Sequence, residues 1–212
     1  MIHHLTMPES LRTTDIVLLA AGLSKRMGST NKMLLPVDGM SMCARCAMQG
    51  LRFLETLPDG GNLIIVTGYK HRELEKTLAP CIDYVSKSSK ALNLIITRNA
   101  DYRKGQFSST KAGVGSVRPD VPFFIALADM PETKPENYSV LCPLLEGHDA
   151  VRPFSEGRPG HPVLHASSLK ARILSMDDRE SVRSLLESCN TLNAPVDGES
   201  WITDVDYPQD YR

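Results

Sequence analysis

Residues 15–36 read DIVLLAAGLSKRMGSTNKMLLP, an apolar run that stops abruptly in a loop of small and basic residues. The run at 16–19 consists of β-forming aliphatic residues without polar alternation, which predicts a strand covered on both faces inside an α/β sheet. Ala20, Ala21 and Gly22 follow. Their small side chains let a base or a phosphate approach the main-chain N–H groups. We interpret the stretch as a strand that leads into a phosphate-binding loop.

Three cations, Lys25, Arg26 and Lys32, belong to this loop. Together they would neutralise a triphosphate and the charge that develops during phosphoryl chemistry. The loop contains neither G-x-G-x-x-G nor the Gly-Lys-Ser/Thr of a Walker loop, so it would bind a nucleotide differently from both. The alternative is an ordinary connection between a strand and a helix, with cations that are solvated surface charge.

A family resemblance is carried by Leu19-Ala20-Ala21-Gly22-x-Ser24-x-Arg26-Met27-Gly28, with Asn31-Lys32 and Leu34-Leu35-Pro36. This pattern resembles the nucleotidyltransferases that make dinucleotide molybdenum cofactors, in particular the molybdenum cofactor cytidylyltransferase branch. The resemblance implies a single-domain Rossmann-like nucleotidyltransferase fold. It also implies that the loop surrounds the nucleotide, with Arg26 and Lys32 as catalytic residues on its phosphates. The expected nucleotide-binding residues in the loop are Leu19, Ala20, Ala21, Gly22, Ser24, Lys25, Arg26 and Lys32.

Length and composition limit the possibilities. A chain of 212 residues that is 42% hydrophobic can form one domain with a substantial core. We expect that domain at residues 15–212, after a disordered tail at 1–14. The net charge of −1 and the 6% aromatic content argue against nucleic-acid binding. We expect neither a membrane span nor a signal peptide, and therefore a cytoplasmic protein.

Five cysteines in a chain of this length do not indicate a disulfide framework. Cys43 and Cys46 have the C-x-x-C spacing, but a zinc or redox site would need further ligands or an exposed helix start, which the sequence does not offer. We expect both on the buried face of a helix at 40–54.

Apolar runs at 63–67, 92–97 and 123–128 alternate with helical segments. This βαβ series predicts a mostly parallel central sheet flanked by helices, with ligands at the carboxyl ends of its strands. Thr67 ends the second strand and is expected to bind nucleotide. Gly68 after it is either a turn residue or a site residue.

Ser108 and Ser109 follow the third strand, within Gly105-Gln106-Phe107-Ser108-Ser109. Either serine can cap the next helix, and a helix N-terminus also attracts anions. Members of the family that the chain resembles carry a similar Gly-x-x-Ser-Ser element against the nucleotide. We therefore expect both serines to combine capping with nucleotide binding.

Asp129 ends the apolar strand at 123–128. A carboxylate at that position needs a helix to cap or a cation, and Mg²⁺ requires only one or two carboxylates besides phosphate oxygens. Asp204 and Asp206 alternate along a predicted strand, where a bound cation would relieve their repulsion. In the resembling family the Asp-x-Pro aspartate holds magnesium. We expect Asp129 and Asp206 as ligands of Mg²⁺, with Asp204 as the alternative to Asp206.

His161 lies in a glycine- and proline-rich segment that predicts a hairpin between a strand at 149–152 and residues up to 164. A lone histidine is often a packed residue. Gly160-His161-Pro162 nevertheless resembles a family element that lines the acceptor side, so His161 is the expected acceptor-binding residue.

Together, the residues and the resemblance predict an Mg²⁺-dependent transfer of CMP from CTP to the phosphate of molybdopterin cofactor, with release of pyrophosphate. Ala21 would favour a pyrimidine by narrowing the base pocket. A molybdoenzyme or its chaperone is the expected transient partner. The alternatives are nucleotidyl transfer with GTP or a sugar phosphate, and a non-catalytic carrier of nucleotide or cofactor.

Overall fold

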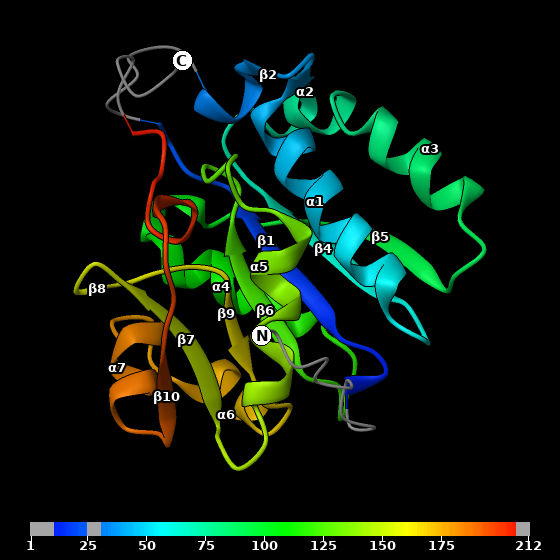
Figure 1. Ribbon diagram of the computed structural model, residues 1–212. Helices are drawn as coiled ribbons and strands as arrows, with labels where there is room; N and C mark the ends of the chain where they lie inside the picture. The colour runs from blue at the N-terminus through cyan, green and yellow to red at the C-terminus, as the bar shows by residue number, and fades with distance from the viewer. Residues whose placement is uncertain (1–10, 25–30, 207–212) are drawn as a thin grey trace.

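β1 (Asp15–Ala20) lies in the middle of an eight-stranded sheet in the computed structural model of the chain, which describes residues 11–24 and 31–206 (Figure 1). The strand order is β10-β7-β9-β6-β1-β4-β5, and β8 pairs with β7. The other strands are β4 (Gly61–Thr67), β5 (Leu92–Arg98), β6 (Phe123–Leu127), β7 (Ala150–Ser155), β8 (Arg158–Pro159), β9 (Val163–His165) and β10 (Thr191–Pro195).

Most of these pairings are parallel. β1 pairs in parallel with β4 and β6, β4 with β5, and β7 with β10. β9 is antiparallel to both β6 and β7 because the chain turns back at Glu156 and Gly157, whose φ angles are 51° and 76°. The predicted mostly parallel α/β sheet is confirmed. The carboxyl ends of β1, β4, β5 and β6 consequently share one edge.

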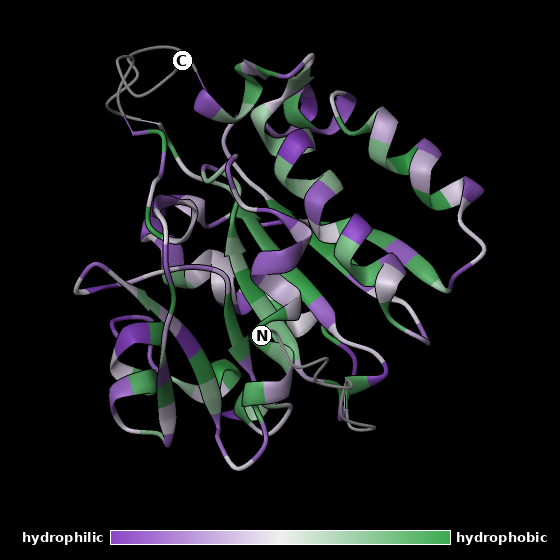
Figure 2. Cartoon of the chain, viewed as in Figure 1, coloured by the Kyte–Doolittle hydropathy of each residue, from purple (hydrophilic) through white to green (hydrophobic). Residues whose placement is uncertain are grey.

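The two faces of β1 are both buried, as its apolar sequence predicts. Ile16, Leu18 and Ala20 belong to one core cluster. Val17, Leu19 and Ala21 belong to a second cluster on the opposite face. Figure 2 shows the central strands as apolar segments within the more polar helices and loops.

Helices cover both faces of the sheet (Figure 1). Residues of four helices contribute to the first cluster: α1 (Met42–Thr56), α2 (His71–Lys76), α3 (Ala79–Lys87) and α5 (Pro135–Ser139). Three helices contribute to the second: α4 (Gln106–Gly115), α6 (Leu169–Ser175) and α7 (Val182–Glu187). Short 3₁₀ turns, η3 (Lys32–Leu34), η4 (Tyr102–Lys104), η5 (Cys142–Leu144) and η6 (Glu199–Trp201), and the hairpin of β2 (Pro36–Val37) and β3 (Met40–Ser41) complete the elements used below.

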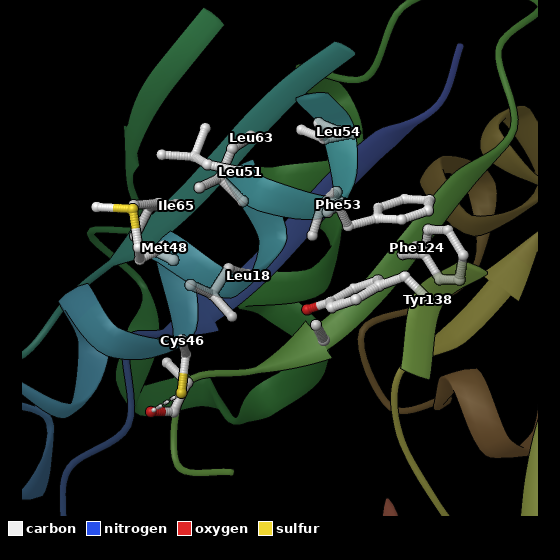
Figure 3. Packing of buried hydrophobic residues seen from close by; sticks show 14 of the residues in the cluster. Leu18, Cys46, Met48, Leu51, Phe53, Leu54, Leu63, Ile65, Phe124 and Tyr138 are labelled. Carbon is white, nitrogen blue, oxygen red and sulfur yellow. Dashed lines mark hydrogen bonds between the residues drawn. The ribbon is translucent and has the colours of Figure 1, made fainter. Parts of the chain in front are cut away.

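α1 contains both cysteines of the C-x-x-C pair. Ser41 caps the helix by accepting a hydrogen bond from the Ala44 N–H, so it begins two residues later than the predicted position 40. Cys43 and Cys46 are buried, and burial raises the pKa of both thiols. The Cys46 thiol donates to the Ala128 carbonyl at 3.4 Å (Figure 3). This contact links α1 to the residue before Asp129.

α4 packs very closely on β1 and β4. A Cβ atom added at Gly113 would lie 2.4 Å from Val17 Cγ1 and 2.7 Å from Val66 Cγ2. Gly113 weakens the helix locally, but the close approach of helix and sheet leaves no room for a side chain at this position.

The packed domain begins earlier than the predicted boundary at residue 15. Leu11 and Thr14 are buried, and the Thr14 hydroxyl donates to the Pro122 carbonyl at 2.7 Å. Burial of Leu11 explains this correction, because its side chain joins the first core cluster. Residues 1–10 of the predicted tail lie outside the described residues. Within 11–24 and 31–206, no helix is both long and apolar enough to cross a bilayer.

Candidate active site

A cavity of about 560 Å³ opens at the carboxyl ends of β1 and β6. Its walls come from the loop after β1, η3, the start of α4, the exit of β6 and the segment 204–206. The predicted site residues that line it are Leu19, Ala21, Gly22, Ser24, Lys32, Ser109, Asp129 and Asp206. Most of the predicted residues thus converge on one cavity, although they are spread over almost the whole chain.

The loop after β1 is tied together by side-chain hydrogen bonds. The Ser24 hydroxyl donates to Asn31 Oδ1 at 3.3 Å and accepts from the Lys32 N–H at 3.1 Å. Asn31 is 1% exposed, and its Nδ2 donates to the Tyr69 carbonyl. These bonds close the two ends of the loop. Lys25 and Arg26, which lie between them in sequence, are outside the described residues.

Gly22 lines the cavity, and a Cβ atom there would meet nothing within 4 Å. A larger side chain would therefore occupy the cavity without disturbing the packing around it. Ala21 is different. It is 4% exposed, and a Cβ atom added at Gly68 would lie 2.9 Å from its Cβ. Gly68, whose role the sequence left open, is thus required by close packing against Ala21 and Tyr102.

Three carboxylates meet at the floor of the cavity. Asp129, Asp204 and Asp206 each place one oxygen within 4.8 Å of the others. Among the described residues, Asp129 Oδ1 is buried and has no hydrogen-bond partner. A buried acceptor of this kind is costly unless a donor or a cation meets it. Carboxylate oxygens are the ligands that Mg²⁺ prefers, so these three residues could hold a divalent cation.

Residues 203–206 do not form the predicted strand. A single backbone hydrogen bond, from the Val205 N–H to the Asp129 carbonyl at 2.9 Å, attaches this segment to the exit of β6. Val205 is buried, whereas the two aspartates beside it reach the cavity. The strand prediction is wrong because no neighbouring strand pairs with these described residues, although both carboxylates still approach Asp129.

Lys32, in η3, lies among the carboxylates. Its Nζ is 2.6 Å from Asp129 Oδ2 and 2.9 Å from Asp206 Oδ1, and the residue is 7% exposed. Burial by itself lowers the pKa of Lys32, but attraction and hydrogen bonding from Asp129 and Asp206 outweigh it and raise the pKa. Burial, followed by repulsion from Asp206 and Asp129, raises the pKa of Asp204. The ammonium therefore stays charged, while the cluster keeps an excess of negative charge.

Of the predicted nucleotide-binding residues that the structure describes, three do not line this cavity: Ala20, Thr67 and Ser108. Ala20 is fully buried in the first core cluster. The Thr67 hydroxyl donates to Glu75 Oε1 at 3.2 Å, within the packing of α2 on β4. Ser108 donates to the Gly105 carbonyl at 2.8 Å. The side chains of Ala20, Thr67 and Ser108 are thus used for local packing and hydrogen bonding.

The prediction that Ser108 and Ser109 cap α4 is also wrong. The N-cap is Gly105, whose φ of 120° and ψ of 176° suit a residue without a side chain, and the serines lie within the first turn. Asn99 Nδ2 donates to both serine hydroxyls at 2.9 Å. Ser109 alone of the pair lines the cavity. Asn99 is therefore a supporting residue that neither its spacing nor its type indicated.

Three further residues line the cavity although no sequence motif marked them: Tyr102, Arg103 and Gln106. The Arg103 guanidinium lies over the Tyr102 ring at 5.6 Å from its centroid. The basic run Tyr102-Arg103-Lys104 directly before Gly105 could have been read as a second phosphate-facing segment, since it follows a strand at the ligand-binding edge.

His161 lines a separate cavity of about 290 Å³, which shares only Leu19 and Gln106 with the first. Its Nδ1 lies 3.4 Å from the Ile125 carbonyl. Burial lowers the pKa of His161, although the bond to Ile125 and the attraction of Asp129 oppose that shift. The predicted acceptor residue is thus beside the carboxylate cavity, on the same face of the sheet as Leu19.

Comparisons with known proteins agree with this architecture. The chain is 28% identical to the molybdenum cofactor cytidylyltransferase of Escherichia coli (strain K12) over 197 residues, which are 93% of each protein. Rv0371c from Mycobacterium tuberculosis H37Rv superposes with a TM-score of 0.73 at 20% identity, over 94% of this chain and 95% of that one. The same protein in complex with manganese superposes with a TM-score of 0.67 at 18% identity, over 94% and 96%. Residues 16–194 match the MobA-like NTP transferase domain, and the chain belongs to that family of nucleotidyltransferases.

Proposed function

We propose that the protein transfers CMP from CTP to the phosphate of a molybdopterin cofactor, with release of pyrophosphate and with Mg²⁺ as its metal. The observation that carries the proposal is the cluster of Asp129, Asp204, Asp206 and Lys32 on the floor of the larger cavity. The cytidylyltransferase of E. coli, which is similar over 93% of the chain, supports the choice of substrates.

The residues at the cluster fit a divalent cation. Asp129 Oδ1 is a buried acceptor without a partner among the described side chains, and two further carboxylates lie within reach of the same point. Asp129 and Asp206 would hold the metal, and Asp204 is close enough to be the third ligand. When bound, a divalent cation neutralises phosphate charge and orients phosphate oxygens.

The protein's part in such a transfer is positioning and charge neutralisation. The acceptor phosphate attacks the α-phosphorus in line, and neither reactant needs strong acid or base assistance. Lys32 holds a positive charge at the cavity floor, where its raised pKa keeps it protonated. The small residue Gly22 leaves the cavity wall open to the nucleotide. Arg26 is proposed to bind the phosphates as well.

Ala21 is proposed to bias the choice of base. Its methyl group lies beside Gly68 at the cavity wall, so it sets how far the wall stands from the bound nucleotide. A difference of one methyl group in a pocket is worth about 1–3 kcal/mol, or roughly 10–200-fold. Polar groups at Gly22 and Ser109, which line the same cavity, are proposed to read the edge of the base.

The test is a turnover panel. The purified protein is incubated with each of the four NTPs, Mg²⁺ and molybdopterin cofactor, and pyrophosphate is measured. Release with CTP that requires the cofactor supports the proposal. Preferential release with GTP would change the proposed nucleotide from CTP to GTP, whereas the proposed reaction class would still hold. No release with any NTP, despite measurable CTP binding, would favour a non-catalytic carrier.

A second measurement separates the roles of the two neighbouring aspartates. If Asp206 is a metal ligand and Asp204 a charge at longer range, Asp206→Asn should weaken Mg²⁺ binding more than Asp204→Asn, as measured by calorimetry. The reverse order would assign the ligand to Asp204. We also propose that the protein acts in the cytoplasm, with a molybdoenzyme or its chaperone as the transient recipient of the product.

A further inference from the structure

The segment that supplies Asp204 and Asp206 is held in place without regular structure. Residues 203–206 form neither a helix nor a strand, and they follow η6 directly. Trp201, the last residue of η6, is 7% exposed and belongs to the first core cluster. Its indole Nε1 donates to the Asp197 carbonyl at 3.1 Å. Trp201 is therefore the packed residue from which the chain extends to the two carboxylates.

The backbone of Trp201 is attached to the turn that carries His161. The His161 N–H donates to the Trp201 carbonyl oxygen at 2.8 Å. A Cβ atom added at Gly160 would lie 2.3 Å from the same oxygen and 3.0 Å from the carbonyl carbon. These separations are far shorter than van der Waals contact. The absence of a side chain at Gly160 is therefore required by the close approach of two backbone segments.

Two side-chain hydrogen bonds hold η6 from other elements. The Ser155 hydroxyl, at the end of β7, donates to the Gly198 carbonyl at 3.1 Å. Asn137 Nδ2, in α5, donates to the Ser200 hydroxyl at 3.2 Å. Together with the contact at Gly160, these bonds fix where η6 ends and where the carboxylate segment begins.

The carboxylate segment is attached at a second point. The Val205 N–H donates to the Asp129 carbonyl at 2.9 Å. Asp204 lies between Trp201 and this bond, and Asp206 follows it directly. A displacement of Trp201 would therefore move the two carboxylates relative to Asp129.

A bound cation would load the same segment. The three carboxylates place oxygens within 4.8 Å of one another. An octahedral Mg²⁺ brings neighbouring ligand oxygens to about 3 Å, and it tolerates little departure from that geometry. The affinity for Mg²⁺ should therefore depend on where Trp201 holds the start of the segment.

We propose that Gly160 is a positioning residue of the metal site. It acts through Trp201: the missing side chain lets the Trp201 carbonyl dock on the turn, and this docking places Asp204 and Asp206 beside Asp129. The inference rests on the proposed function for the presence of a divalent cation at the three aspartates. It adds that the turn of the predicted acceptor residue and the metal ligands are joined through the backbone.

The experiment compares Gly160→Ala with Gly61→Ala in the whole protein, with Mg²⁺ binding measured by calorimetry. A Cβ atom at Gly61 would lie 2.0 Å from the Thr14 carbonyl oxygen, at the amino end of β4. Both variants thus force a backbone carbonyl to move, and both should lower the unfolding temperature. Mg²⁺ affinity should fall about 10-fold or more in Gly160→Ala and stay within about twofold of the parent in Gly61→Ala.

Trp201 reports on the junction directly, because it is the only tryptophan of the chain. Its fluorescence emission should shift to the red in Gly160→Ala, since a displaced carbonyl loosens the packing of a side chain that is 7% exposed. Gly61→Ala should keep the emission of the parent. In the parent, saturating Mg²⁺ should change the emission, because two of the proposed ligands follow Trp201 by three and five residues.

Equal Mg²⁺ affinity in Gly160→Ala and the parent, or equal losses in the two glycine variants, would overturn the inference. If Gly160→Ala does not fold, NMR of the parent decides: Mg²⁺ should shift the single indole N–H resonance, and an unchanged resonance at saturating Mg²⁺ would contradict the proposal.

The outcomes also separate the inference from the proposed function. Absence of Mg²⁺ binding in the parent would remove both the proposed metal and the inference. Pyrophosphate release by the parent, with unchanged Mg²⁺ affinity in Gly160→Ala, would remove the inference alone. Weakened Mg²⁺ binding in Gly160→Ala, without pyrophosphate release by the parent, would remove the proposed transfer alone.

Discussion

The two cavities share the face of β1 that Leu19 occupies, yet they are built in different ways. The larger one is lined by loop residues at the carboxyl ends of strands and contains three aspartates and a lysine. The smaller one is lined by strand and helix residues, and its buried polar groups are neutral histidines. Loops at the sheet edge can hold charges that water and counter-charges compensate, whereas an unpaired charge in the interior of the sheet is costly, which favours neutral histidines there.

The largest expected effect comes from removing the charge of Asp129, which tests whether the larger cavity depends on its carboxylates for turnover. Asp129→Asn keeps the shape and should lower pyrophosphate release by about 10³-fold or more, because a positioned charge at phosphate is among the largest catalytic contributions. The protein should stay folded, since Lys32 loses Asp129 but keeps Asp206 as its partner, and repulsion among the three carboxylates falls. Asp83→Asn, an exposed partner of Lys87 on α3, is the control. Near-normal turnover in Asp129→Asn would contradict the assignment.

The burial of His165 in the smaller cavity can be tested by the pH dependence of protein stability. Since burial lowers the pKa of His165 to about 4, the unfolded chain binds a proton that the folded one excludes between pH 6.5 and 4. The free energy of unfolding should therefore decrease as the pH is lowered from 6.5 to 4, and His165 accounts for about 3 kcal/mol of that decrease. Denaturant unfolding of His165→Phe should show a correspondingly smaller loss between pH 7 and 4. Identical pH slopes in both proteins would show that His165 titrates normally.

Substitution of Lys32 tests whether its ammonium group neutralises part of the negative charge of the carboxylate cluster. Lys32→Met should lower kcat roughly 10- to 100-fold with a smaller effect on CTP affinity, because the ammonium meets charge that grows in the transition state. Without nucleotide, the same variant should bind Mg²⁺ more tightly by calorimetry, since Asp129 and Asp206 lose their ammonium partner. Equal losses in kcat and CTP affinity would reduce Lys32 to a binding residue.

Gly22→Ala tests whether the nucleotide occupies the part of the larger cavity beside Gly22. The added methyl group would meet nothing within 4 Å, so the unfolding temperature should stay the same while the KM for CTP rises by about 10-fold. Gly115→Ala, which also adds a methyl group into open space but away from the cavity, should leave KM unchanged. An unchanged KM in Gly22→Ala would place the nucleotide elsewhere.

The smallest expected effect is that of Ala21→Gly. The Ala21 side chain is almost wholly buried beside Gly68, so its removal should change the ratio of kcat/KM for CTP and GTP by less than about 10-fold. A parent preference for GTP, or no change of the ratio in the variant, would leave Ala21 with a packing role only.

Some features could be predicted from local sequence because they depend on nearest neighbours. Periodicity and residue type predict that the apolar side chains of 16–21 are buried on both faces of the sheet. They also predict the burial of the two cysteines of α1 and the positions where the strands end. The misplaced cap of α4 shows the limit of this reasoning. Ser108 and Ser109 have good capping side chains, but Gly105 reaches a backbone conformation that favours glycine and begins the helix earlier.

Residue type and periodicity were enough to predict that a strand covered on both faces leads into a loop of small and basic residues, and that Asp129 follows another buried strand. Tertiary structure explains how Asp204 and Asp206 reach Asp129, because the Val205 N–H donates to the Asp129 carbonyl and Lys32 pairs with both Asp129 and Asp206. It also decided the environment of His165, since β9 enters the sheet antiparallel between β6 and β7 and buries that ring with an unpaired Nε2. Both outcomes depend on contacts between residues that are distant along the chain, which residue type and spacing do not encode.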